Sequence, residues 1–129
     1  MNRATVISNL LGHPYDDAVH HCWWLASLVQ RDVFGRDLPG WTGARPAPAA
    51  RTRIFRGHPA RSSWQAFPEP CDGDLVLMGK AGGLETHCGV YLGDFAGIIH
   101  SDKPHGVVID TLPEIRVAGW AHLSFNRPI

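Results

Sequence analysis

The chain has 129 residues and a mass of 14.2 kDa, which suits one domain of ordinary size over residues 1–129. Its 12 basic and 12 acidic side chains balance to a net charge of zero. This excludes a strongly charged disordered chain and argues against a nucleic-acid binder. No apolar run approaches the roughly 18 residues that a membrane-spanning helix needs, so membrane insertion is not expected.

Residues 1–14 predict a short lead-in segment. Ser8, Asn9 and His13 interrupt any signal-peptide core, so we expect synthesis in the cytoplasm without a secretion signal. The following residues, 16–34, predict a helix with one apolar stripe. The stripe consists of Leu25, Leu28, Val29 and Val33. Acidic residues 16 and 17 favour a helix start and Gly35 favours a stop, which places Cys22 in or near the first turn.

Residues 39–63 differ in composition from the rest of the chain. They form a basic, Pro/Gly-rich excursion with five arginines and no acidic residue, and residues 49–55 could form a short helix. One interpretation is a solvated loop with a basic face. The other is an arm that contacts an anionic substrate or a partner protein.

From Trp64 onward the pattern is typical of β-structure. Strands are expected at residues 74–78, 87–92, 96–101, 107–111 and 121–125. A helix followed by a run of antiparallel strands indicates an α+β domain.

A predicted hairpin brings two of the eight histidines together. With a two-residue turn at Gly93-Asp94, His87 lies opposite His100 on one face of the sheet, with Cβ atoms about 4.5–5.5 Å apart. A loop longer by an even number of residues keeps both rings on that face. Cys88 then points to the other face and is interpreted as a core residue.

Cysteine and histidine in this arrangement are typical of nucleophilic catalysis. A helix N-terminus favours a thiolate, a neighbouring imidazole accepts the thiol proton, and a third polar group orients that imidazole. Cys22, His87 and His100 fit these roles in that order, with Asp102 as an alternative orienting residue. A zinc site made of Cys22, His87, Cys88 and His100 is disfavoured, because neighbouring strand residues face opposite sides. Three cysteines without a CxxC pair also make a disulfide framework a poor interpretation.

Several segments, in this order, resemble a known family. They are Gly-His-Pro-Tyr (12–15), Cys-Trp-Trp-Leu (22–25), Phe-Gly (34–35), Leu-Pro (38–39), Trp64, Gly-Asp-Leu-Val-Leu-Met (73–78), His-Cys-Gly-Val-Tyr-Leu-Gly (87–93), Ile-His (99–100) and Phe-Asn-Arg-Pro (125–128). Together they resemble the NlpC-type cell-wall cysteine peptidases, most closely the small branch encoded by tailed phages and prophages. The resemblance covers residues 10–129. Three places depart from the family pattern. His21 replaces an aspartate before the cysteine, Trp24 replaces a glycine, and Asp-Asp-Ala (16–18) stands where a Gly-Gly often follows the tyrosine.

The resemblance implies a papain-like fold, with an N-terminal helix that carries the nucleophile packed on an antiparallel sheet. It implies hydrolysis of amide bonds in the peptide stems of peptidoglycan by Cys22 as nucleophile, His87 as base and His100 as orienting residue. Tyr15 would polarise the substrate carbonyl, and no metal or cofactor is implied. The expected setting is a phage tail tip, with other tail-tip proteins as partners and action in the host periplasm or cell wall. The alternative is a non-catalytic structural or assembly protein of the tail that keeps the peptidase fold.

Overall fold

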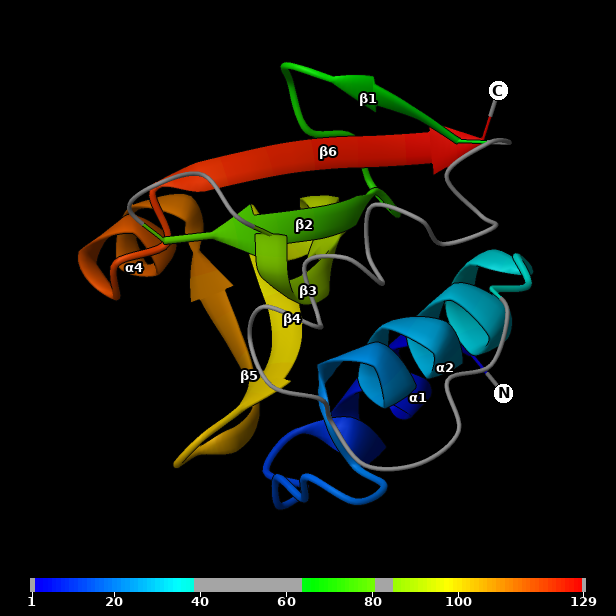
Figure 1. Ribbon diagram of the computed structural model, residues 1–129. Helices are drawn as coiled ribbons and strands as arrows, with labels where there is room; N and C mark the ends of the chain where they lie inside the picture. Colours follow the sequence, from blue (N-terminus) through cyan, green and yellow to red (C-terminus); the bar gives the residue numbers. More distant parts are fainter. Residues whose placement is uncertain (1, 39–63, 81–84, 129) are drawn as a thin grey trace.

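The computed structural model describes residues 2–38, 64–80 and 85–128, and the predicted α+β fold is confirmed (Figure 1). Two helices come first, α1 (Arg3–Leu10) and α2 (Cys22–Phe34). The strands then follow in chain order: β1 (Trp64–Phe67), β2 (Leu75–Gly79), β3 (Glu85–Leu92), β4 (Gly97–Asp102), β5 (Gly106–Thr111) and β6 (His122–Pro128). A 3-10 turn, η2 (Gly93–Phe95), joins β3 to β4, and a short helix, α4 (Leu112–Val117), lies between β5 and β6.

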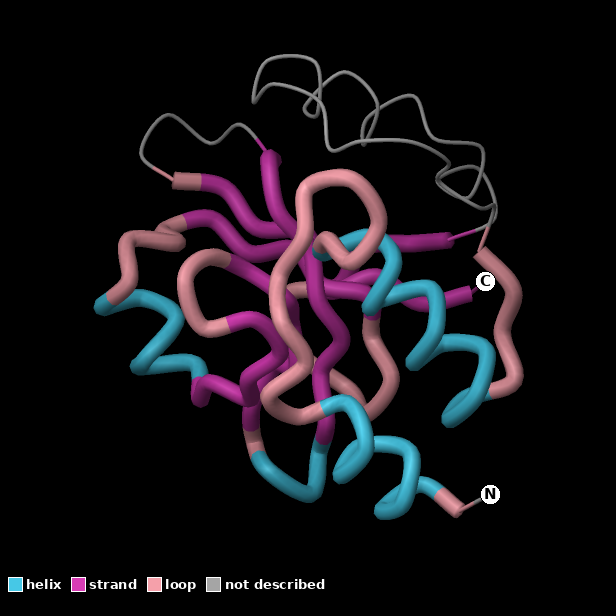
Figure 2. Tube along the Cα trace, turned by 90° about the horizontal axis from the view of Figure 1, so that it is seen from below, coloured by secondary structure: helices cyan, strands magenta, loops and turns pink. Residues whose placement is uncertain are grey.

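The six strands form one antiparallel sheet in the order β1-β6-β2-β3-β4-β5. Strand alternation divides its side chains between two apolar clusters. On one face, residues including Leu77, Cys88 and Val90 pack against α1 and α2. On the other face, residues including Met78 and Ile98 pack with α4 and Trp120. Figure 2, turned by 90° from Figure 1, shows α1 and α2 on the same side of the strands.

The helix expected over residues 16–34 begins later, at Cys22. Asp16 makes a turn of its own, because its carboxylate accepts hydrogen bonds from the backbone N–H groups of Ala18 at 2.6 Å and Val19 at 3.3 Å. His21 is the N-cap of α2, and its Nδ1 accepts from Trp24 N at 3.4 Å. Cys22 is therefore the first residue of the helix, which places it in the first turn as predicted. Gly35 ends the helix in the left-handed conformation, with φ 65°.

Three elements were not among the sequence predictions. The expected lead-in segment contains α1, which buries Val6, Ile7 and Leu10 against the core. Strand β1 pairs with β6 at the edge of the sheet. Helix α4 begins with a capping box between Thr111 and Glu114, a Thr-x-x-Glu signature that is readable in the sequence. The possible helix at residues 49–55, and the basic excursion as a whole, lie outside the described residues. In the described part of the chain, no helix has the length and apolar character that crossing a membrane requires.

The register of the β3–β4 hairpin differs from the prediction by two residues. Val90 pairs with Ile99 rather than with Gly97, and Leu92 pairs with Gly97. The loop is longer because Gly93–Phe95 form a 3-10 turn and Ala96 adopts a left-handed conformation with φ 48°. A shift of two residues preserves the face on which every side chain lies, so both histidines stay on one face.

Candidate active site

The two predicted histidines meet on the Trp120 side of the sheet. His87 Nε2 lies 2.8 Å from His100 Nδ1, within hydrogen-bond distance, and the rings meet edge to face with centroids 5.0 Å apart. Both side chains are buried. The hydrogen bond expected between the rings is therefore present, with His100 diagonal to His87 rather than directly opposite.

A third polar side chain, which sequence analysis missed, extends this pair. His100 Nε2 lies 2.8 Å from Asp110 Oδ2. In the β4–β5 ladder Ile98 pairs with Asp110 and His100 with Val108, so Asp110 shares the face of His100. An acidic residue in the apolar stretch Val-Val-Ile-Asp was the available signal. Pairing of the second hairpin around residues 103–105 would have found it.

Burial and hydrogen bonding govern the charge states of these groups. Burial lowers the pKa of His100 below its usual value, and this effect exceeds the opposing influence of the Asp110 carboxylate. The hydrogen bond from His100 lowers the pKa of Asp110. Near neutral pH, His100 is therefore a neutral imidazole and Asp110 is a carboxylate.

Asp102, the alternative orienting residue, lies farther from His87. Its Oδ2 is 3.9 Å from His87 Nε2, whereas His100 Nδ1 is 2.8 Å from the same nitrogen. Of the two, His100 is thus the group in direct hydrogen-bond contact with His87.

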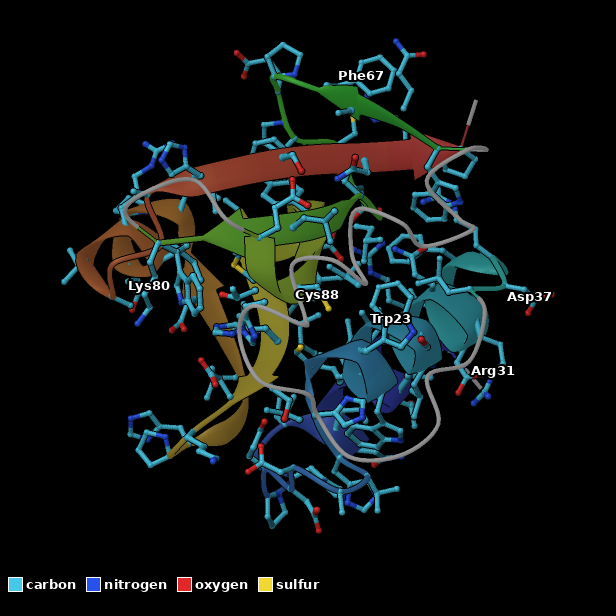
Figure 3. All side chains as sticks on the ribbon, viewed as in Figure 1. Trp23, Arg31, Asp37, Phe67, Lys80 and Cys88 are labelled. Atoms are coloured by element: carbon cyan, nitrogen blue, oxygen red, sulfur yellow. The ribbon has the colours of Figure 1, made fainter. Side chains whose placement is uncertain are left out.

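Trp120 covers the ring of His87. The two rings stack with centroids 4.9 Å apart and an interplanar angle of 18°. The ammonium group of Lys80 lies 4.8 Å from the Trp120 ring centroid. Figure 3 labels Lys80 near α4 and Cys88 between β3 and α2. Trp120 was not predicted, because no local pattern indicates which residue after β5 covers a side chain on β3.

Cys22 approaches the same strands from the α2 side. Its side chain is 2% exposed and belongs to the apolar cluster that contains Cys88, the residue after His87. The start of α2 is attached to β4 because Ser101 Oγ donates to the carbonyl of His20 at 3.3 Å. Ser101 is flanked in sequence by His100 and Asp102. Cys88 itself is a core residue, as predicted.

His87 Nδ1 takes no part in the hydrogen bond to His100, which uses Nε2. Nδ1 is buried and has no hydrogen-bond partner among the described residues. A buried ring nitrogen without a partner is uncommon, and unpaired groups of this kind require a structural or functional explanation. A base that exchanges a proton with a thiol and a substrate supplies such an explanation.

Tyr15 lies in the loop between α1 and α2. Its hydroxyl donates to Asp17 Oδ1 at 2.6 Å, and the ammonium group of Lys103 lies 5.5 Å from its ring centroid. Lys103 Nζ is also 2.8 Å from Asp17 Oδ2. These contacts attach the loop to the turn between β4 and β5. The role of Tyr15 at a substrate carbonyl stays a prediction.

The departures from the family pattern at His21 and Trp24 have local structural roles. His21 caps α2 through an unprotonated Nδ1, a role that an aspartate oxygen usually fills. Trp24 packs against two histidine rings of the preceding loop, with centroids 5.0 Å from His13 and 4.6 Å from His20. The bulky residue at position 24 thus packs against the loop as well as against the apolar cluster between the helices and the sheet.

No group of three or more His, Cys, Asp or Glu side chains in the described ranges is arranged to hold a metal ion. Cys22, Cys71 and Cys88, which all lie in the described ranges, form no disulfide.

Residues 12–122, most of the chain, match the NlpC/P60 family. The chain belongs to the NlpC/P60 family. A comparison with curated proteins finds no match. Membership indicates a cell-wall peptidase or amidase that acts on peptidoglycan, and the α+β arrangement agrees with the papain-like fold of NlpC/P60 domains.

Proposed function

We propose that this NlpC/P60 domain is a cysteine amidase that hydrolyses amide bonds in the peptide stems of peptidoglycan. Cys22 is the nucleophile, His87 the base and His100 the orienting residue. The observation that carries the proposal is the His87–His100 hydrogen bond, together with a His87 Nδ1 that is buried and has no hydrogen-bond partner among the described residues.

The proposed reaction proceeds in two stages. Cys22 Sγ–H transfers its proton to His87 Nδ1, and the thiolate attacks the carbonyl carbon of the stem amide. The tetrahedral intermediate collapses, the C–N bond breaks, and the imidazolium returns the proton to the departing amine. Water, deprotonated by His87, then hydrolyses the thioester and regenerates the thiol. Tyr15 and backbone N–H groups at the start of α2 stabilise the oxyanion in this scheme.

The direct test is incubation of the protein with purified peptidoglycan and analysis of the released muropeptides. Cys22→Ala should abolish release and Cys22→Ser should nearly do so, because loss of a nucleophile costs several orders of magnitude in rate. Cys71→Ala is the matched control, because Cys71 is an exposed thiol distant in sequence from the site. Release by Cys22→Ala at the parental rate would remove Cys22 from the mechanism.

Thiol alkylation near neutral pH tests the pairing of Cys22 with His87. In a Cys71→Ala background the remaining thiols are Cys22 and the fully buried Cys88. This background is needed because Cys71 is an exposed thiol that the alkylating reagent also reaches. We expect rapid modification of Cys22 that is lost in His87→Ala. Rapid, selective modification that survives His87→Ala would exclude His87 as the base.

We further propose that the enzyme is a component of a phage tail tip that opens the host wall locally. Support comes from the resemblance of sequence segments to those of the phage and prophage branch, from Gly-His-Pro-Tyr at 12–15 to Phe-Asn-Arg-Pro at 125–128. Peptides of the chain should be found by mass spectrometry in purified tail particles from the source strain. Their absence from such particles would contradict this setting. An inert thiol and no muropeptide release, with the chain present in tails, would instead support the alternative of a non-catalytic tail protein.

A further inference from the structure

A continuous line of hydrogen bonds crosses three neighbouring strands on the Trp120 side of the sheet. It runs from His87 on β3 to His100 on β4 and then to Asp110 on β5, with two successive contacts of 2.8 Å. We propose that Asp110 is a positioning residue that sets the tautomers of both histidines, so that His87 presents a lone pair at Nδ1. Its catalytic meaning rests on the proposed function.

The assignment follows from the donor and acceptor capacity of each group. An ionised carboxylate can only accept, so His100 must carry its proton on Nε2 to donate to Asp110. Neutral His100 then has a lone pair on Nδ1 and accepts a hydrogen bond from His87 Nε2–H. Neutral His87 therefore carries its proton on Nε2 and keeps the lone pair on Nδ1. This is the ring nitrogen that is buried without a partner.

The reverse arrangement would prevent base catalysis. If His100 carried its proton on Nδ1, it would donate to His87 Nε2, and the proton of His87 would lie on Nδ1. The nitrogen that has to accept the thiol proton would then already be protonated. Asp110 acts against this arrangement because a protonless His100 Nε2 would place a lone pair 2.8 Å from a carboxylate oxygen.

Asp110 also supports the charge that His87 acquires during the reaction. When His87 becomes an imidazolium, its Nε2–H donates to His100, whose Nε2–H donates to the carboxylate. Other charged or titratable groups surround this line. Asp102 lies 3.9 Å from His87, the Lys80 ammonium group lies 4.8 Å from the Trp120 ring centroid, and His105 acts electrostatically on Asp110. Asp110 is the carboxylate in direct contact with His100.

The first test reads the tautomers without any substrate. Ring ¹⁵N resonances distinguish protonated from unprotonated histidine nitrogens. In the parent protein at neutral pH, both His87 and His100 should be protonated at Nε2. In Asp110→Ala, both rings should become tautomer mixtures, and Asp110→Asn should be intermediate because its amide oxygen still accepts. Asp102→Asn is the matched comparison. Unchanged tautomers in Asp110→Ala, or a larger change in Asp102→Asn, would overturn the inference.

The second test uses muropeptide release. Asp110→Ala should lower kcat by roughly 10- to 100-fold with little change in KM. An effect of this size is expected for a residue that orients a catalytic side chain through an intervening group. Asp110→Asn should recover part of the rate, because its amide oxygen still accepts the hydrogen bond from His100. A parental kcat in Asp110→Ala would overturn the inference.

Together the two tests separate the inference from the proposed function. If the parent protein releases no muropeptides but its tautomers depend on Asp110, the proposed function fails and the positioning role stands. If the parent is active and neither tautomers nor rate respond to Asp110→Ala, the positioning role alone fails. Thermal unfolding of each variant confirms that the readouts come from folded protein.

Discussion

Gly89 lies between His87 and Tyr91 on β3, where strand β4 passes unusually close. A Cβ atom added at this glycine would lie 2.6 Å from Ile98 Cγ2, 2.6 Å from the carbonyl oxygen of Ile99 and 3.0 Å from His100 Cβ. The carbonyl belongs to the backbone, and the methyl group of a β-branched side chain has little freedom to rotate away. The strands themselves must therefore separate to accommodate a Gly89→Ala substitution.

The expected cost follows from two opposing effects. Overpacking a core typically costs about 1–3 kcal/mol, and two unavoidable contacts place Gly89→Ala near the upper end. Alanine also restricts the unfolded chain, which returns about 0.4–1 kcal/mol where the native backbone tolerates it. The net loss should be about 2 kcal/mol. At roughly 4 °C per kcal/mol for a chain of this size, the Tm should fall by about 8 °C.

Urea and thermal unfolding measure this change, with Gly93→Ala as the matched control in the same hairpin. The nearest atoms to a Cβ at Gly93 would belong to the Asp72 side chain, at 3.3 Å or more, so the control should lie within about 0.5 kcal/mol of the parent. The displaced β4 should also lengthen the His87–His100 hydrogen bond and slow hydrolysis. Equal stability of the two variants would refute the close approach of β3 and β4 on which this reasoning depends.

Three further predictions concern charges. Arg127→Met should lower the free energy of unfolding in urea by about 3 kcal/mol, because it leaves the 1% exposed Asp74 without its cationic partner at 2.8 Å. A double variant that also carries Asp74→Asn should regain stability, and a single variant as stable as the double would contradict this. Asp72→Asn should destabilise the fold at pH 7, because the hydrogen bond from Arg3 lowers the pKa of Asp72. The difference in free energy of unfolding between variant and parent should disappear as the pH falls below about 4. A difference that does not depend on pH would refute this prediction. Burial lowers the pKa of His100, so the contribution of the neutral ring to the free energy of unfolding is complete above about pH 6.5 and is lost as the pH falls below that value. His100→Asn should flatten the curve of stability against pH between pH 7.5 and 5.5. An unchanged slope would count against the buried neutral ring.

The sequence by itself determined the fold class, the order along the chain of the strands from β2 to β6, and the common face of His87 and His100. These features depend on local patterns. Alternation with period two assigns His87 and Cys88 to opposite faces whatever the register, and a two-residue change in the hairpin loop preserves that assignment. The segments from Gly-His-Pro-Tyr to Phe-Asn-Arg-Pro also indicated the family that the match over residues 12–122 shows.

Other features did not follow from these patterns. Helix α2 begins at residue 22 and not at the predicted residue 16, because Asp16 closes a turn of its own and His21 supplies the N-cap. Asp110 contacts His100 because of the β4–β5 register. Trp120 contacts His87 because the two rings stack on the same face of the sheet. Local propensity acts over a few neighbouring residues, whereas pairing of separate strands and packing between layers depend on the geometry of turns and on the shape of the whole core. The tertiary structure therefore determined which polar groups complete the histidine pair.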